Sequence, residues 1–119
     1  MSVNLTLFDR IIKSPIGFKN WDWLSRNPTL RIHHLVNNSS LPWNWKIVSK
    51  HPRITMNDID NNLHLPWDFM SVSYNPNITS WIVTKHNDKN WDYFYIATLG
   101  NISVPVIKSN NDMIEYINI

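Results

Sequence analysis

Four stretches of sequence decide the fold, because they align without gaps at a spacing of 24 residues. They read KNWDWLSRNPTL (19–30), WNWKIVSKHPRI (43–54), WDFMSVSYNPNI (67–78) and WDYFYIATLGNI (91–102). A fixed period between 20 and 50 residues is typical of tandem-repeat architectures. We therefore expect one repeat domain over residues 1–119. Its parts are a half unit at 6–18, units at 19–42, 43–66, 67–90 and 91–111, and a capping tail at 112–119.

Each unit is predicted to begin with a helix of about eight residues that an Asn or Asp side chain caps. The cap position holds Asn20, Asn44, Asp68 and Asp92. Aromatic, aliphatic and small residues follow on one helical face, and a proline at 28, 52 or 76 favours the end of the helix. Before the cap stand Trp43, Trp67 and Trp91, in the position of a hydrophobic staple, which predicts that these rings are buried.

A second helix is predicted in each unit after a Thr or Ser cap. The cap residues are Thr55, Thr79 and Ser103. The pairs Thr6/Asp9 and Thr55/Asp58 have the spacing of a capping box. The predicted buried column of this helix holds Ile11, Leu35, Ile59, Val83 and Ile107.

The predicted fold class is therefore all-α, with short αα-hairpin tandem repeats stacked into a small solenoid-like domain. The alternative is a β structure, because stretches such as ITSWIVT (78–84) are rich in β-branched residues. The cap columns, the proline positions and the lack of glycine-rich hairpin turns favour helices. Helices this short must gain their stability from stacking between units.

Composition excludes several classes of function. The 119 residues include no Cys and only 2 Gly, which excludes thiolate catalysis, Cys-based zinc sites and glycine-rich phosphate loops. No catalytic constellation is visible, so we expect no enzyme activity and no cofactor. His33 and His34 are adjacent and are expected to diverge on a helix, so no metal site is predicted. The absence of long apolar runs and of a signal-peptide pattern predicts an intracellular protein without a membrane span.

Candidate binding residues are those that differ between units. On the first helix, a pair of positions at i and i+4 changes from charged to apolar along the chain. The candidates for a partner-binding or self-association patch are Met70, Tyr74, Trp81 and Phe94. Aromatic side chains beside charged ones are typical of interface hot spots. The alternative is that Met70 and Phe94 pack under the C-terminal tail.

Charge is also distributed unevenly. Residues 1–53 carry a net charge of +6 and residues 54–119 a net charge of −4. The candidate basic patch consists of Arg26, Lys46, Lys50 and Arg53. Three interpretations stay open: binding of nucleic acid or an acidic surface by residues 1–53, self-association of basic and acidic halves in a homodimer, and an unevenly charged solvated surface. Nucleic acid is the less favoured partner, because the cations form no dense cluster.

The motif PWNW…VSKHPRIT and its copy PWDF…VSYNPNIT resemble the Trp- and Asn-rich short tandem repeats found in proteins of mimivirus-like giant DNA viruses. The resemblance covers residues from about 19 to 110. Lys19 replaces the Trp in the first unit, and Leu99-Gly100 replaces Asn-Pro in the last. The resemblance implies a repeat scaffold without catalytic residues, a host or viral protein partner, and a place in the host cytoplasm or the virion.

Overall fold

The computed structural model describes residues 5–15, 17 and 19–102 of the chain. Within these residues it contains eight short α-helices and no strand, so the helical prediction is confirmed and the β alternative is wrong. The helices are α1 (Leu7–Lys13), α2 (Trp21–Arg26), α3 (Ile32–Asn37), α4 (Trp45–Ser49), α5 (Met56–Asp60), α6 (Phe69–Val72), α7 (Ser80–Lys85) and α8 (Tyr93–Thr98). The predictions for Ser103, Ile107 and the tail at 112–119 lie outside the described residues.

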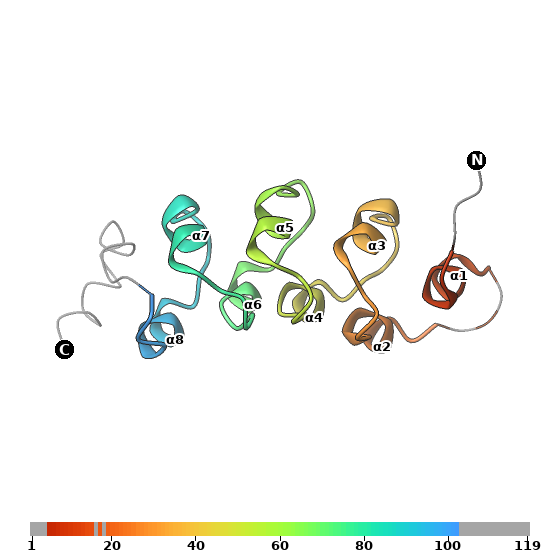
Figure 1. Ribbon diagram of the computed structural model, residues 1–119, viewed down its shortest axis with the longest axis horizontal. Helices are drawn as coiled ribbons and strands as arrows, with labels where there is room; N and C mark the ends of the chain where they lie inside the picture. Colours follow the sequence, from red (N-terminus) through yellow and green to blue (C-terminus); the bar gives the residue numbers. More distant parts are fainter. Residues whose placement is uncertain (1–4, 16, 18, 103–119) are drawn as a thin grey trace.

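The helices lie in two rows along an elongated molecule of 55 × 30 × 21 Å (Figure 1). One row contains α2, α4, α6 and α8, and the other contains α3, α5 and α7. The chain alternates between the rows, and α1 lies at the N-terminal end. Every second helix in sequence is therefore a neighbour in space.

Most helix starts are capped as predicted. Thr6 and Thr55 close capping boxes with Asp9 and Asp58. Backbone N–H groups in the first turns of α2, α4 and α8 donate to Asn20, Asn44 and Asp92. Asp68 caps α6 by position alone, since its carboxylate accepts from the Ser71 hydroxyl at 2.7 Å. Thr79 precedes α7 without a cap bond, and its buried Oγ1 has no hydrogen-bond partner.

The helices are shorter than the expected eight residues, at four to seven. The chain leaves helical hydrogen bonding at Asn27, Lys50 and Ser73, before the prolines at 28, 52 and 76 are reached. Asn27 and the residues in the same column, His51 and Asn75, each accept the N–H two residues further on. This Asx-type turn competes with continuation of the helix.

The predicted core columns are buried in the second and later helices, with one correction at the N-terminus. Leu35, Ile59 and Val83 are fully buried. In α1 the buried residues are instead Phe8 and Ile12, while Ile11 is half-buried. α1 belongs to a half unit, so its orientation is set by contacts with α3, such as the edge-on packing of Phe8 against the His34 ring.

The small residues on the first helix make a recurring polar contact. Ser25, Ser49 and Ser73 are fully buried. Their hydroxyl oxygens accept the backbone N–H of Asn44, Asp68 and Asp92, at 2.8, 2.9 and 2.8 Å respectively. Each serine thus binds the cap residue of the next helix in the same row. Ala97, the fourth member of this column, is exposed.

The tryptophans before the caps are buried, as the staple positions predicted, and each makes two recurring contacts. The indole N–H groups of Trp43, Trp67 and Trp91 donate to the carbonyl oxygen five residues earlier, at 2.7–2.9 Å. Each ring packs edge-on against the aromatic residue 22 positions earlier, with centroids 5.1–5.4 Å apart. Each tryptophan therefore connects the loop before it to the preceding helix of the same row.

A further polar contact joins successive turns. The buried side-chain amide of Asn75 donates to the carbonyl oxygens of Ser49, His51 and Ile54 at 3.0–3.1 Å. His51 occupies the equivalent position one period earlier, and its Nε2 lies 2.7 Å from the carbonyl oxygen of Asn27. In the second row, Asp60 of α5 accepts from Lys85 and contacts His86 after α7.

Candidate functional site

A variable surface runs along the row formed by α2, α4, α6 and α8. At each of these helices two residues four positions apart are exposed, although Lys50 directly follows α4 and Tyr74 lies two residues after α6. We call these eight residues the outer ridge: Asp22, Arg26, Lys46, Lys50, Met70, Tyr74, Phe94 and Thr98. The ridge is charged over α2 and α4 and mainly apolar over α6 and α8.

The apolar end of the ridge combines Met70, Tyr74 and Phe94, whose exposed fractions are 37%, 45% and 59%. Tyr74 stacks on Tyr95 of α8, with centroids 4.2 Å apart and an interplanar angle of 29°. Its hydroxyl also donates to the Asp92 carboxylate, and this hydrogen bond is the main reason that the pKa of Tyr74 is raised above 10.0. These contacts hold Tyr74, in the turn after α6, against Tyr95 of α8.

Trp81 does not belong to this surface. It is exposed, but it lies on α7 in the other row of helices. The structure therefore places three of the four predicted patch residues on or just after helices of one row, and the fourth on a helix of the other row. The sequence offered no means of relating the two rows, since Trp81 was chosen only because it departs from its own column.

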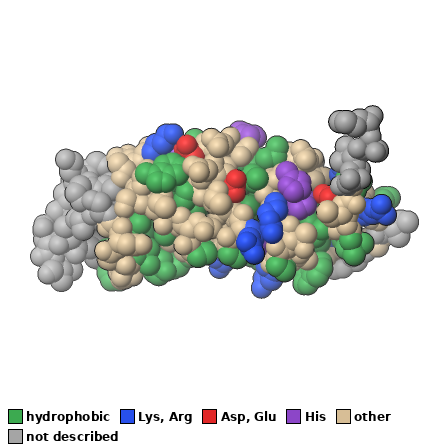
Figure 2. Space-filling view, in the orientation of Figure 1, with side chains coloured by type: hydrophobic (Ala, Val, Ile, Leu, Met, Phe, Trp, Pro, Cys, Tyr) green, Lys and Arg blue, Asp and Glu red, His purple; other side chains and the backbone are tan. Residues whose placement is uncertain are grey.

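The cationic end of the ridge surrounds a hollow between α2 and α4. Arg26 and Lys50 line this hollow of about 280 Å³ together with Ile47, His51 and Pro52. Lys46 and Arg53 are exposed and do not line it. Among the described residues, none of these four cations lies in an ion pair with a carboxylate. In Figure 2, Lys and Arg side chains lie at the centre of the visible face and along its lower edge, and others lie toward both ends.

His51, which lines the hollow, is held as a neutral ring. Its Nδ1 accepts the N–H of Arg53 at 3.0 Å, so its proton lies on Nε2 and points to the Asn27 carbonyl oxygen. Burial is the largest cause that lowers its pKa below 6.5, and the nearby charges of Arg31 and Arg53 lower it further. The hollow therefore owes its charge to Arg26 and Lys50.

Trp23 is an exposed aromatic residue that sequence reasoning missed. More than half of it, 53%, is exposed. It lines a second hollow of about 280 Å³ between α1 and α2, together with the exposed Leu7 and the buried Phe8. The repeat alignment could have identified it, because the residues at its position in the other units are Ile47, Ser71 and Tyr95 and none is a tryptophan.

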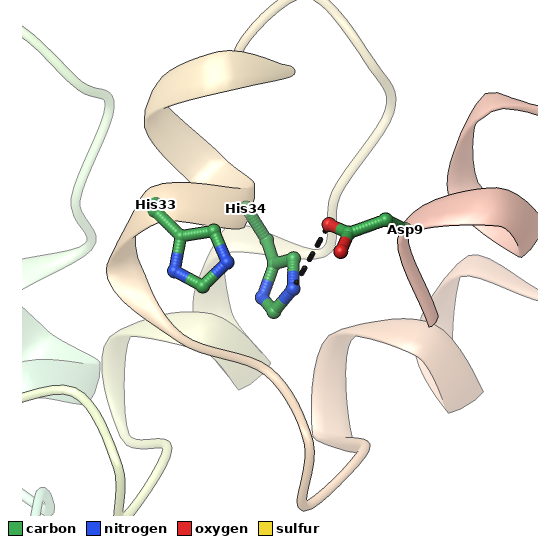
Figure 3. A group of neighbouring side chains, drawn as sticks. All are labelled: Asp9, His33 and His34. Carbon is green, nitrogen blue, oxygen red and sulfur yellow. Dashed lines mark ion pairs between the residues drawn. The ribbon is translucent and has the colours of Figure 1, made fainter. Parts of the chain in front are cut away.

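Asp9, His33 and His34 form a cluster where α1 meets α3 (Figure 3). One side-chain atom from each lies within 4.8 Å of the others, and the two imidazole centroids are 4.0 Å apart. The expectation that adjacent histidines diverge is therefore wrong. His33 is exposed and His34 is buried, yet the rings tilt toward each other at the start of α3.

The hydrogen bonds of His34 do not fit a metal ligand. Its Nδ1 accepts the Arg31 N–H at 2.8 Å, so the proton of the neutral ring is on Nε2. Nε2 faces Asp9 at 3.3 Å, although outside good hydrogen-bond geometry. A metal on Nε2 would require a proton on Nδ1, where the Arg31 N–H already points. The cluster is better explained as a polar contact between α1 and α3, in which burial lowers the pKa of His34.

Comparison with protein-family models, with curated proteins and with solved structures found no match to this chain. In the part of the chain that the structure describes, no helix is long and apolar enough to cross a membrane. The functional assignment therefore rests on the surfaces described above.

Proposed function

We propose that this protein is a non-catalytic helical repeat module that binds a partner protein, host or viral, or a second copy of itself, through the outer ridge. The observation that supports this most is that Met70 of α6, Tyr74 just after α6 and Phe94 of α8 are all exposed. Tyr74 is already held by its stack on Tyr95 and its hydrogen bond to Asp92, and a restrained aromatic side chain loses little entropy on binding, which favours an interface.

The scaffold is part of the same proposal. The serine, tryptophan and Asn75/His51 contacts recur at 24-residue intervals, which supports a solenoid-like stack of short αα-hairpins. Three of the chain's serine hydroxyls are committed to this stack as buried acceptors and are unsuited to nucleophilic chemistry. A source in mimivirus-like giant DNA viruses remains part of the proposal, on the resemblance of the motifs alone.

Introducing carboxylates at the apolar end tests this function. Full-length protein is immobilised and incubated with host-cell lysate, and sedimentation measures self-association separately. The double variant Met70→Asp/Phe94→Asp should lose the bound partner or the dimer while keeping its circular dichroism spectrum. Leu63→Asp is the matched control, because Leu63 is exposed at 45% and lies off the ridge. Unchanged binding by the double variant would disprove the assignment of the ridge.

Nucleic acid is the second candidate partner, because Arg26, Lys46, Lys50 and Arg53 have no carboxylate partner among the described residues. Binding of phosphates releases counterions and depends steeply on salt. A gel shift with a duplex at low salt should then be lost on Lys46→Ala/Lys50→Ala/Arg53→Ala. A complete lack of shift at low salt rejects this candidate.

A further inference from the structure

From α2 to α8 the residues of the outer ridge change from charged to apolar, and this order restricts which ligands can bind along it. Its α2 and α4 positions hold three cations against one carboxylate, Asp22. Its α6 and α8 positions hold Met70, Tyr74, Phe94 and Thr98, with no charge. Because each position is exposed, one continuous ligand can contact both ends. A ligand that matches both ends must itself be charged at one end and apolar at the other.

We propose that the outer ridge binds a linear segment of a partner protein that carries carboxylates at one end and aliphatic or aromatic side chains at the other. The carboxylates lie in the hollow between α2 and α4, and the apolar side chains lie on α6 and α8. This inference rests on the proposed function and specifies the chemistry of the partner. The choice of a peptide is argued from charge complementarity along the ridge.

The cationic end suits carboxylates because Arg26 and Lys50 face one hollow from two helices. Asp22 does not neutralise them: its carboxylate accepts the Asn44 side-chain amide at 2.8 Å, and among the described residues no cation lies in an ion pair with it. Arg26 donates from Nε to the Asp22 carbonyl oxygen, which anchors the base of its guanidinium. Ile47 and Pro52 give the hollow apolar walls, where a charge contact is less screened than on open surface.

The apolar end suits a hydrophobic anchor because its central aromatic side chain, Tyr74, is restrained. Tyr74 is fixed by its stack on Tyr95 and by its hydrogen bond to Asp92. These two contacts join the turn after α6 to α8 and its cap residue, so an apolar side chain entering beside Met70 and Phe94 meets a tyrosine that is already fixed. Preorganisation of this kind lowers the entropic cost of binding.

The distance between the ends sets the spacing in the ligand. Packed helices lie roughly 8–10 Å apart, so the centres of the α2–α4 and α6–α8 pairs are separated by roughly 16–20 Å. An extended peptide rises about 3.3 Å per residue and spans this distance in about five or six residues. The carboxylates and the apolar anchors of the ligand should therefore be separated by about that number of residues.

A nucleic acid is a poorer match for the same surface. Its phosphates repeat evenly along the strand, whereas the cations of the ridge stop at α4. Over α6 and α8 the phosphates would meet Met70 and Phe94 and approach the Asp92 carboxylate that binds Tyr74. A peptide with acidic and apolar blocks avoids this mismatch.

Selection from a random 12-residue peptide display library, against the full-length protein, tests the proposal. Enriched peptides should carry at least two Asp or Glu residues about five positions from a pair of aliphatic or aromatic residues. A labelled peptide from this set should bind the Lys46→Glu/Lys50→Glu variant about tenfold more weakly. It should also lose binding to Met70→Asp/Phe94→Asp. Lys13→Glu on α1 is the matched charge control and should bind normally.

Several results would overturn the proposal. The cationic end would not bind carboxylates if the enriched peptides lacked acidic residues. The same would follow if Lys46→Glu/Lys50→Glu left the peptide affinity unchanged. If such peptides still depend on Met70 and Phe94, the proposed function stands while this inference fails. A lack of any enriched peptide also rejects it. Displacement of the labelled peptide by a 20-nucleotide single strand that binds more tightly would assign the surface to nucleic acid. Circular dichroism of each variant excludes unfolding as the cause.

Discussion

At the scale of single residues, the buried serines do more than leave space for a neighbouring helix. Ser49 accepts the Asp68 N–H, which belongs to a cap residue and has no partner within its own helix. A hydroxyl oxygen is small enough to lie between two packed helices and polar enough to accept this bond. Alanine would keep the space and lose the acceptor.

We expect Ser49→Ala to lower the free energy of unfolding by about 1–3 kcal/mol, because it leaves a buried N–H without an acceptor. Urea denaturation followed by circular dichroism measures the change. Ser40→Ala is the control, since Ser40 is exposed in a turn and should change stability by less than about 0.5 kcal/mol. Equal effects of the two substitutions would show that the hydroxyl of Ser49 is dispensable.

His51 makes stability depend on pH. Burial lowers its pKa below 6.5, so the unfolded chain binds a proton more readily than the folded protein does. His34 is shifted in the same direction, also mainly by burial. The stabilising contribution of the neutral rings is complete above about pH 6.5. It is lost progressively as pH falls below that value toward the lowered pKa. The carboxylates whose pKa is lowered, Asp9 and Asp60, have ordinary values of 3.8 and act at lower pH.

Unfolding free energy should therefore decrease between pH 7.5 and pH 5, and His51→Asn should reduce that decrease. Asparagine is the natural choice because Asn75 fills the equivalent position with the same turn and a donor to the preceding segment. Denaturation at several pH values gives the slope for both proteins. An unchanged slope in His51→Asn would show that other groups cause the dependence.

At the scale of the helix, identical residues at equivalent positions differ in what they contribute. Thr55 closes a capping box with Asp58, whereas the hydroxyl oxygen of Thr79 is buried and has no partner. The residue three positions after Thr79 is Ile82, which has no side-chain acceptor with which to complete a box. The start of α7 therefore depends on packing of Ile82 and Val83.

Replacing each threonine by valine separates these roles. Thr55→Val should destabilise the protein by about 1 kcal/mol through loss of the cap. Thr79→Val should leave stability unchanged or increase it, because it removes a buried polar atom without a partner. The pair is matched in chemistry and shape, so comparison of their urea midpoints is direct. A larger loss for Thr79→Val than for Thr55→Val would contradict this assignment.

At the scale of the whole molecule, stability depends on contacts between segments 19 to 26 residues apart in sequence. Among the described residues, Asn75 makes the most such bonds, because its amide donates to three carbonyl oxygens. Asn27 begins the same column, and its side chain makes a local bond, accepting the Thr29 N–H. The two asparagines therefore differ in the length of chain that they connect.

We expect Asn75→Ala to lower the free energy of unfolding by about 2–4 kcal/mol, because it removes three buried hydrogen bonds as well as a turn. Asn27→Ala should cost about 1 kcal/mol. Chemical denaturation gives both free energies of unfolding. For Asn75→Ala, hydrogen exchange should show weaker protection of backbone amides both before and after residue 75 in the sequence. Equal costs would mean that the long-range bonds of Asn75 do not contribute.

Much of the helical pattern could be predicted because its determinants are local. Asn20, Asn44 and Asp92 cap the next turn of the same segment, so their role can be inferred from spacing. The prediction at Ile11 was wrong because the rotation of α1 depends on α3, and the expectation for His33 and His34 was wrong for a similar reason. At the site, the sequence pointed to Met70, Tyr74 and Phe94 because the residues at their repeat positions differ between units. Trp81 was grouped with them because the sequence does not say which row a helix occupies.

The sequence alone determined the helical class, most of the caps and the buried columns except at Ile11, since these follow from the period of the side chains along one short helix. Only the tertiary structure decided which exposed residues share a surface. It paired Arg26 with Lys50 across a hollow, stacked Tyr74 on Tyr95 and separated Trp81 from both. The physical reason is that a contact between helices depends on their relative positions. Those positions are set by many weak packing and hydrogen-bond terms acting together, and no single spacing in the sequence encodes them.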